Sequence, residues 1–218
     1  MALSIDSAYL PDIIEIARTV PVVGVTTNPT LLLQAQKRGQ DLKPEQLLNE
    51  LLHAIGGTIF MQPGAATEEA MYEQALAYIQ TAPDRVIPKI PMTPVGMRVA
   101  KQLHTHRIAF TAVTSVAQAY SAAVLEAHFI IPYYNRLQRL GIDASKRLAE
   151  MAEVLSQQQL PTRILAASIK SPGEAVSALL AGAHDITAAP DILLEMVSDP
   201  HTEAAVEKFT QDWQKVNK

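Results

Sequence analysis

Short apolar segments bounded by turn residues alternate along this sequence with longer segments of helical periodicity. Eight of the short segments are typical of buried strands, at residues 3–5, 22–25, 58–61, 85–90, 107–111, 128–131, 163–167 and 185–187. The stretches between them are rich in Ala, Leu, Glu and Gln, for example at 68–80, 95–104, 117–126, 145–157 and 174–180. Strands that alternate with helices favour parallel βαβ units, and eight repeats favour a closed α/β barrel, the (β/α)8 TIM barrel, over an open doubly wound sheet.

Nothing in the composition indicates a division into two domains. The chain has 218 residues, 48% of them hydrophobic, and has no Gly/Ser stretch, charge block or low-complexity tract that could be a linker. We therefore predict a single barrel domain over residues 1–218. Residues 202–216 follow the eighth unit and predict an extra C-terminal helix with an apolar stripe, Ala205, Val206, Phe209, Trp213 and Val216. We expect this helix to pack on the barrel or on another subunit.

Three predicted helices begin with a capping side chain followed by proline, just beyond a predicted strand. These pairs are Asn28–Pro29, Thr93–Pro94 and Ser171–Pro172. The spacing from Ser171 to Glu174 also predicts a capping box, in which Glu174 reaches back to the Ser171 backbone. The caps locate the carboxyl ends of the strands, where barrel enzymes carry their chemistry.

Charge and composition exclude several classes of partner. The net charge is −4, which supplies no general attraction for nucleic acid or an anionic membrane, so a small molecule is the expected partner. Without cysteine there is no disulfide or thiolate metal site, and the six histidines offer one close pair, His104 and His106, so we expect no metal. No basic leader or long apolar span is present, and a cytoplasmic location is expected.

Lys89 lies within the apolar, proline-bracketed run 86–91. If the run is a buried strand, burial disfavours the charged ammonium and lowers the pKa of the lysine, and a neutral amine is a nucleophile toward carbonyls. The alternative is a lysine near a strand end whose stem packs while its head reaches water. The neighbouring residues decide between the two.

Polar residues occur at or just after the predicted carboxyl ends of seven strands. In chain order they are Asp6, Thr26, Thr27, Asn28, Gln62, Lys89, Thr111, Tyr133, Arg136, Ser168 and Lys170. Each has an ordinary structural alternative, such as a helix cap or a surface base. A barrel would nevertheless bring all of them to one mouth, which favours a catalytic role for Lys89.

Five motifs in this set closely resemble the transaldolase family, and within it the short subgroup of fructose-6-phosphate aldolases. They occur in the family's order and spacing over essentially the whole chain: Ile5-Asp6, Gly24-Val25-Thr26-Thr27-Asn28-Pro29-Thr30, Lys89-Ile90-Pro91, Pro132-Tyr133-Tyr134-Asn135-Arg136 and Leu165-Ala166-Ala167-Ser168-Ile169-Lys170. The second motif is specific, whereas Lys-Ile-Pro alone would be weak.

The resemblance implies a role for each site residue. Lys89 would form a Schiff base with a dihydroxyacetone unit, and no metal or other cofactor would be needed. Asp6, Asn28 and Thr26 would serve the donor side, while Gln62, Thr111 and Tyr133 would position the group that shuttles protons. Arg136, Ser168 and Lys170 would bind the phosphate of the acceptor aldehyde. Ile131 replaces a small residue beside the donor and would narrow the pocket.

The resemblance also orders the possible functions. Gln62 and Tyr133 are the aldolase residues at positions where members that transfer the unit carry Glu and Phe, so a lyase acting on fructose 6-phosphate or a similar sugar phosphate is expected. A transaldolase and a non-catalytic sugar-phosphate-binding barrel are the alternatives. Relatives of the short subgroup imply a homo-oligomer, a pentamer or decamer. Pro88 replaces the usual Val, and we expect a local bulge there.

Overall fold

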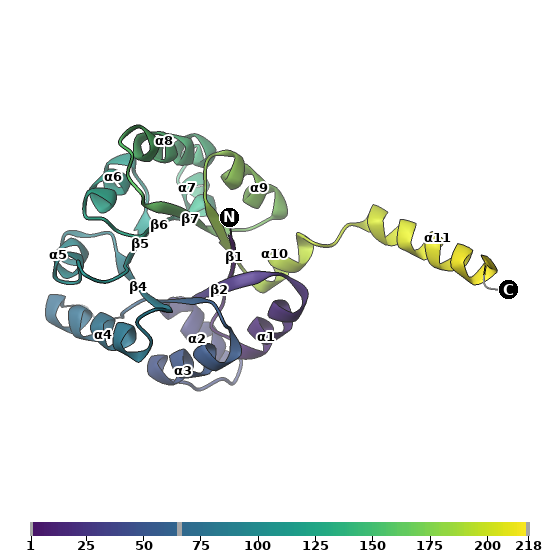
Figure 1. Cartoon of the computed structure of the whole chain (residues 1–218), viewed down its shortest axis with the longest axis horizontal. Coiled ribbons are helices and arrows are strands. Elements are labelled where there is room, and N and C mark those ends of the chain that lie inside the picture. The colour runs from purple at the N-terminus through teal and green to yellow at the C-terminus, as the bar shows by residue number, and fades with distance from the viewer. Residues whose placement is uncertain (1, 65–66, 217–218) are drawn as a thin grey trace.

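The computed structural model describes residues 2–64 and 67–216, and these form a closed barrel of eight parallel strands in chain order (Figure 1). The strands are β1 (Ala2–Asp6), β2 (Val22–Thr26), β3 (Thr58–Met61), β4 (Val86–Pro91), β5 (Ala109–Val113), β6 (Phe129–Pro132), β7 (Arg163–Ile169) and β8 (Asp185–Ala188). Each corresponds to one predicted segment, with ends that differ by at most two residues. The predicted TIM barrel is confirmed.

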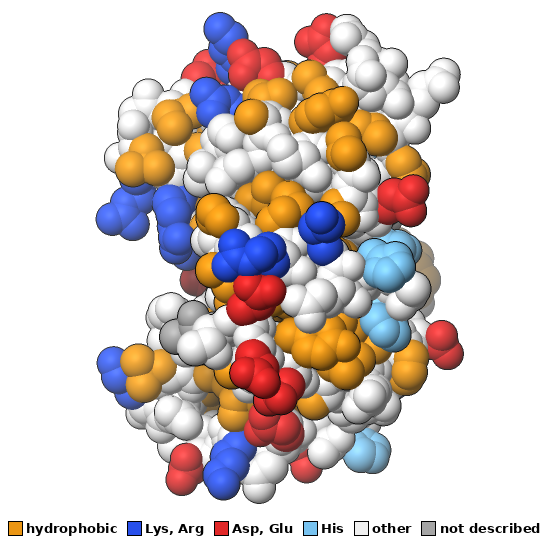
Figure 2. All heavy atoms as spheres, turned by 90° about the vertical axis from the view of Figure 1, so that its left-hand side faces the viewer, with side chains coloured by type: hydrophobic (Ala, Val, Ile, Leu, Met, Phe, Trp, Pro, Cys, Tyr) orange, Lys and Arg blue, Asp and Glu red, His pale blue; other side chains and the backbone are white. Residues whose placement is uncertain are grey.

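Helices cover the outside of the barrel, except the last one, which extends away from it (Figure 1). They are α1 (Leu10–Thr19), α2 (Pro29–Lys37), α3 (Pro44–Ala54), α4 (Glu68–Thr81), α5 (Pro94–Gln102), α6 (Val116–Val124), α7 (Tyr134–Arg139), α8 (Ala144–Gln157), α9 (Pro172–Leu180), α10 (Pro190–Glu195) and α11 (Pro200–Val216). Within the described ranges, none is long and apolar enough to cross a membrane. Figure 2 views the side that carries α4 and α5, where basic and acidic side chains are interspersed among apolar ones.

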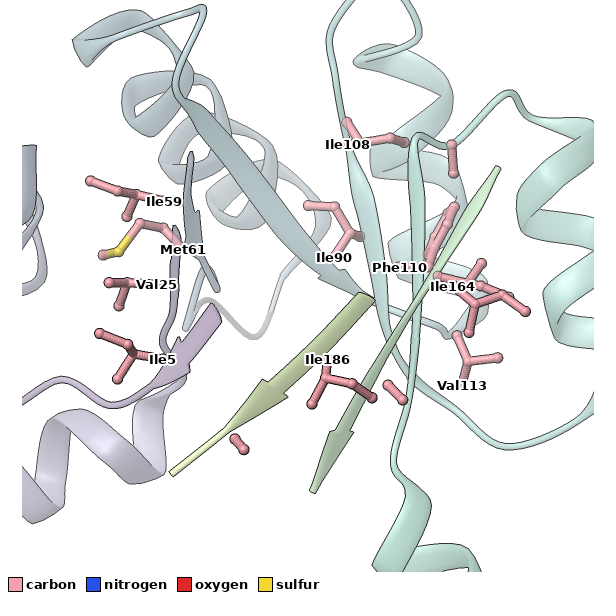
Figure 3. Packing of buried hydrophobic residues seen from close by; sticks show 14 of the residues in the cluster. Ile5, Val25, Ile59, Met61, Ile90, Ile108, Phe110, Val113, Ile164 and Ile186 are labelled. Carbon is pink, nitrogen blue, oxygen red and sulfur yellow. The ribbon is translucent and has the colours of Figure 1, made fainter. Parts of the chain in front are cut away.

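The alternation of side chains along the strands sorts the apolar residues into two clusters. One contains strand residues such as Ile5, Val25 and Ile90, packed against residues of the surrounding helices (Figure 3). The other consists of strand residues alone, namely Phe60, Ile87, Ala109, Ile131, Leu165 and Ala167, so it fills the barrel interior. Because successive strand residues point to opposite faces, Lys89 points inward with Ile87 while Ile90 points toward the helices.

The three proline caps are confirmed, and the capping box is wrong in one detail. The side chains of Asn28, Thr93 and Ser171 accept hydrogen bonds from the third helical residue of α2, α5 and α9. The Glu174 carboxylate, however, accepts from the backbone N–H of Lys170 at 2.8 Å rather than from that of Ser171. Its other oxygen accepts from the Asn135 side chain at 2.8 Å, and this second contact draws the carboxylate across to the first turn of α7.

The bulge expected at Pro88 is not present. Irregularities occur instead between β1 and β2 at Leu3/Ser4 and near the carboxyl ends of two other strands. Pairing of β4 with β3 ends at Pro88 and pairing with β5 begins at Lys89, so the missing N–H of Pro88 interrupts neither ladder. Register shifts occur near the carboxyl ends of β5 and β7. Ala112 and Ser168 lie in these shifts with φ of 60°, a left-handed conformation that costs energy in residues other than glycine.

The C-terminal helix is confirmed, but it does not pack on the barrel. α11 extends away from the other elements (Figure 1), and none of its residues is buried. The apolar stripe of α11 faces solvent, and the exposed fractions of Phe209 and Trp213 are 67% and 68%. Of the two expectations for this helix, contact with another subunit is the one that remains.

Removal of residues 202–218 should therefore reduce the assembly state of the protein. If a second copy covers the stripe, truncation exposes the matching surface and loses the contact. Light scattering of the full chain and the truncated chain measures this. The barrel should keep its circular dichroism spectrum and melting temperature, and an unaltered assembly state would contradict a role for α11 in assembly.

A buried tyrosine on α4 gives a second prediction. The Tyr78 hydroxyl is buried without a hydrogen-bond partner among the described residues, and burial raises its pKa. Because an unpaired buried hydroxyl costs free energy, Tyr78→Phe should raise the free energy of unfolding by about 1 kcal/mol.

A matched control is available in Tyr134, which is equally buried. Its hydroxyl lies 2.6 Å from the Ser145 hydroxyl, so Tyr134→Phe should lower the free energy of unfolding by about 1 kcal/mol. Denaturant titration of both variants measures the difference. Equal losses in the two would show that the Tyr78 hydroxyl is paired after all.

Candidate active site

A cavity of about 480 Å³ opens at the carboxyl ends of the strands. Nine of the eleven predicted site residues line it: Asp6, Asn28, Gln62, Lys89, Thr111, Tyr133, Arg136, Ser168 and Lys170. They come from seven strands or the loops that follow them, which is the convergence that barrel closure produces. A smaller cavity of about 310 Å³ lies beside the loop after β1 and shares Leu31 and Gln34 with the first, but none of the predicted residues lines it.

The other two predicted residues, Thr26 and Ile131, are fully buried and are not among the described residues that line the cavity. Ile131 belongs to the interior cluster, which also contains Ala167. Ala167 lines the cavity and Ile131 does not, so narrowing of the pocket by Ile131 stays a prediction. Thr26 lies behind Asp6 and is bonded to it, as described below.

Lys89 is 2% exposed, so its head does not reach bulk water and the alternative interpretation of this lysine is wrong. Its Nζ donates to the backbone carbonyl of Thr27 at 2.8 Å. Burial lowers the pKa of Lys89, and the negative charge of Asp6 opposes that shift. A neutral amine held by one of its N–H groups keeps its lone pair available, which is the condition for attack on a carbonyl carbon.

The Asp6 carboxylate accepts a hydrogen bond from one threonine hydroxyl, which in turn contacts a second one. The Thr26 hydroxyl donates to Asp6 Oδ1 at 2.7 Å, and the same hydroxyl lies 2.7 Å from that of Thr187 on β8. Asp6 and Thr26 are paired across β1 and β2, so the sheet register brings them together. The carboxylate is thereby oriented at the rim, where its charge acts on Lys89.

Thr111 and Tyr133 form a hydroxyl pair on the opposite side of the cavity. Their oxygen atoms are 2.8 Å apart. Burial raises the pKa of Tyr133, while the bond from Thr111 and the charge of Arg136 oppose the shift. The phenol therefore stays protonated at neutral pH and can donate a proton or a hydrogen bond within the cavity.

Arg136 and Lys170 make one edge of the cavity positive. The Arg136 guanidinium lies 4.5 Å from the centre of the Tyr133 ring, a cation–π contact. Ser168 lies near the end of β7, and Lys170 lies directly after that strand. The Glu174 carboxylate links Lys170 to Asn135 beside Arg136. The N–H of Glu174 is already bonded to the Ser171 hydroxyl, so an anion here would depend mainly on the side chains of Arg136, Ser168 and Lys170.

Two features of the site escaped the sequence analysis. Thr187 ends the predicted strand 185–187, so the rule that selected polar residues at strand ends could have included it. The left-handed Ala112 and Ser168 both line the cavity, but an alanine and a serine carry no sequence signal for positive φ. No three His, Cys, Asp or Glu side chains in residues 2–64 and 67–216 are grouped to hold a metal ion, and metal-free chemistry stays a prediction.

A family model described as Transaldolase/Fructose-6-phosphate aldolase matches residues 3–218 of this chain. The fold is also similar to that of solved mandelate oxidase, with a TM-score of 0.60 and 14% identity over 88% of this chain and 66% of that one. A solved flavocytochrome b2 gives a TM-score of 0.62 and 12% identity over 88% and 57%. The chain spans two thirds or less of these structures, and at such identity the likeness concerns the fold alone.

The pKa of Lys89 predicts the pH dependence of its reactivity. Labelling by hydroxyacetone and cyanoborohydride should rise with pH and level off below 10.5, the ordinary pKa of lysine, because burial lowers the pKa. Asp6→Asn removes a charge that raises this pKa, so the profile should move to still lower pH. Peptide mass spectrometry measures the labelled fraction. If labelling levelled off only at pH 10.5, or if the profile of Asp6→Asn moved to higher pH, the lowered pKa of Lys89 would be contradicted.

Proposed function

Since this chain belongs to the transaldolase/fructose-6-phosphate aldolase family, we propose that it is a Schiff-base aldolase that makes or cleaves fructose 6-phosphate or a similar sugar phosphate. The observation that carries the proposal is the Lys89 amine, buried and with a lowered pKa at the base of a cavity lined by Asp6 and Tyr133. A scaffold protein would gain nothing from burying an ammonium, whereas imine chemistry requires a neutral amine.

In the cleavage direction, the Lys89 nitrogen attacks the ketone carbon of the sugar, and loss of water gives a protonated imine. The carbon–carbon bond of the aldol then breaks. Its electron pair moves into the imine to form an enamine. The hydroxyl on the departing carbon loses its proton to a group of the cavity, and this fragment leaves as the aldehyde. Protonation of the enamine carbon and hydrolysis of the imine release dihydroxyacetone and regenerate the amine. The positively charged imine supplies the electron sink for this cleavage.

The polar residues of the cavity bind the donor, stabilise the imine and transfer protons. Asp6 and Asn28 hydrogen-bond the hydroxyls of the donor, and the charge of Asp6 stabilises the cationic imine. Tyr133 and Thr111, already 2.8 Å apart, transfer protons directly or through a water that Gln62 helps to position. The raised pKa of Tyr133 keeps the phenol protonated, so that it can donate a hydrogen bond to the reacting oxygen atoms.

Arg136, Ser168 and Lys170 bind the phosphate of the aldehyde acceptor. Two cationic side chains at one edge of the cavity support an anionic substituent there, and guanidinium binds phosphate through two parallel hydrogen bonds. The substrate would then lie across the barrel mouth, with its donor half near Asp6 and its phosphate near the loop after β7.

Gln62 and Tyr133 favour an aldolase over a transaldolase. The phenol supplies a proton donor that phenylalanine lacks, which favours hydrolytic release of free dihydroxyacetone over transfer to a second aldehyde. With fructose 6-phosphate alone, we therefore expect free dihydroxyacetone to accumulate. Tyr133→Phe should slow this release more than it slows transfer to erythrose 4-phosphate. Chromatographic product analysis measures both, and a wild-type enzyme that releases nothing until the acceptor is added would be a transaldolase.

Lys89→Met should abolish both turnover and borohydride trapping of dihydroxyacetone while leaving the fold intact. Methionine has a similar length but cannot form an imine. Intact mass reports the trapped adduct, and circular dichroism reports the fold. A wild-type protein that traps nothing under conditions that trap a known aldolase would indicate a non-catalytic sugar-phosphate-binding barrel.

The proposed partners are small sugars and further copies of the same chain, with no nucleic acid or membrane. The exposed stripe of α11 supports a homo-oligomer, for which the family resemblance suggests a pentamer or decamer. A cytoplasmic location agrees with a cysteine-free chain, since a reducing compartment offers no use for disulfides.

A further inference from the structure

Thr187 is a buried polar residue for which the proposed mechanism has no role. It lies on β8, is 0% exposed and is not among the described residues that line the active-site cavity. β1 lies between β2 and β8 in the barrel, and the Thr26 and Thr187 side chains meet across it with their hydroxyl oxygens 2.7 Å apart. Two strands on either side of Asp6 are thus joined by one hydrogen bond.

The direction of this bond follows from proton counting. A hydroxyl has one hydrogen, and that of Thr26 is donated to Asp6 Oδ1 at 2.7 Å. Thr26 can therefore only accept from Thr187, so Thr187 must be the donor. The result is a directed chain from Thr187 to Thr26 to Asp6. Each bond polarises the next, and the bond between Thr26 and Thr187 is buried.

We propose that Thr187 is a positioning residue for the aldol reaction, which holds the Thr26 hydroxyl in the orientation that donates to Asp6. This inference rests on the proposed function. If Thr187 could not donate, the Thr26 oxygen would lack a buried partner and its hydroxyl would be free to turn away from Asp6. The carboxylate would then lose the contact that fixes it beside Lys89.

The charge of Asp6 explains why its orientation matters. It already acts on Lys89 in the free protein, where it raises the pKa against the effect of burial. When Lys89 forms a cationic imine, a carboxylate that is already fixed stabilises the new charge without having to reorganise. Asn28 also holds the donor hydroxyls, whereas the charge of the imine is stabilised by Asp6. The loss of Thr187 should therefore affect the reacting state more than substrate binding.

Thr187→Val tests this, because valine keeps the shape and removes only the hydroxyl. We expect kcat for cleavage of fructose 6-phosphate to fall about tenfold, the rate equivalent of one hydrogen bond, with KM changed less than about twofold. Thr187→Ser restores the donor and should bring kcat back to within about threefold of wild type. Failure of serine to rescue would indicate that the methyl group matters and would overturn the proposal.

A double-mutant cycle with Thr26→Val tests whether the effect of Thr187 on kcat requires the Thr26 hydroxyl. If Thr187 acts only through Thr26, then Thr187→Val should cost about tenfold in the wild-type background and nothing when Thr26 is already valine. Equal losses in both backgrounds would overturn the proposal, as would a wild-type kcat in Thr187→Val.

Thr162 offers a matched control far from the cavity. It is 2% exposed, and its hydroxyl donates to the Ala127 carbonyl at 2.6 Å. Thr162→Val should lower the melting temperature without changing kcat. A wild-type protein with neither turnover nor a trapped adduct would overturn the proposed function and this inference together, whereas an active enzyme indifferent to Thr187→Val overturns this inference alone.

Discussion

The site depends on the burial of the Lys89 amine, which costs free energy because the amine is removed from water. Burial lowers its pKa, the Thr27 carbonyl accepts one of its hydrogens, and the charge of Asp6 limits how far the pKa falls. These three effects have different sources: the closed barrel, the backbone after β2 and the end of β1. The barrel must therefore be complete before the lysine has its reactive form. Stability is given up at this position for chemistry, as is usual at active sites.

Barrel closure brings together side chains that are far apart in the chain. Register pairs Asp6 with Thr26, and closure through β8 adds Thr187 from the other end of the sequence. Local irregularities complete the arrangement. The bulges of β5 and β7 place Ala112 and Ser168 in left-handed conformations at the rim, where backbone strain is maintained by the surrounding sheet.

The sequence correctly predicted those features that depend on residues close together in the chain, namely the strands and several helix starts. All eight strands could be located because apolar segments and helical periodicity reflect which faces are buried, and three helix starts could be located because Asn28, Thr93 and Ser171 cap their own helices. The expectations that failed depended on distant neighbours. Glu174 is drawn to Asn135 on α7, and Pro88 falls where pairing passes from one neighbouring strand to the other. α11 forms as predicted but does not pack on the barrel, and its contact with another subunit stays a prediction.

For this protein, the sequence by itself determined the barrel and most of the polar residues at the mouth, because these follow from periodicity along the chain and from the common edge that parallel strands share. Only the tertiary structure decided that Thr26 and Ile131 are buried without lining the cavity, and that the Thr187 hydroxyl meets that of Thr26. Those facts depend on which side chains of different strands meet across the barrel, and closure sets that geometry rather than any local pattern.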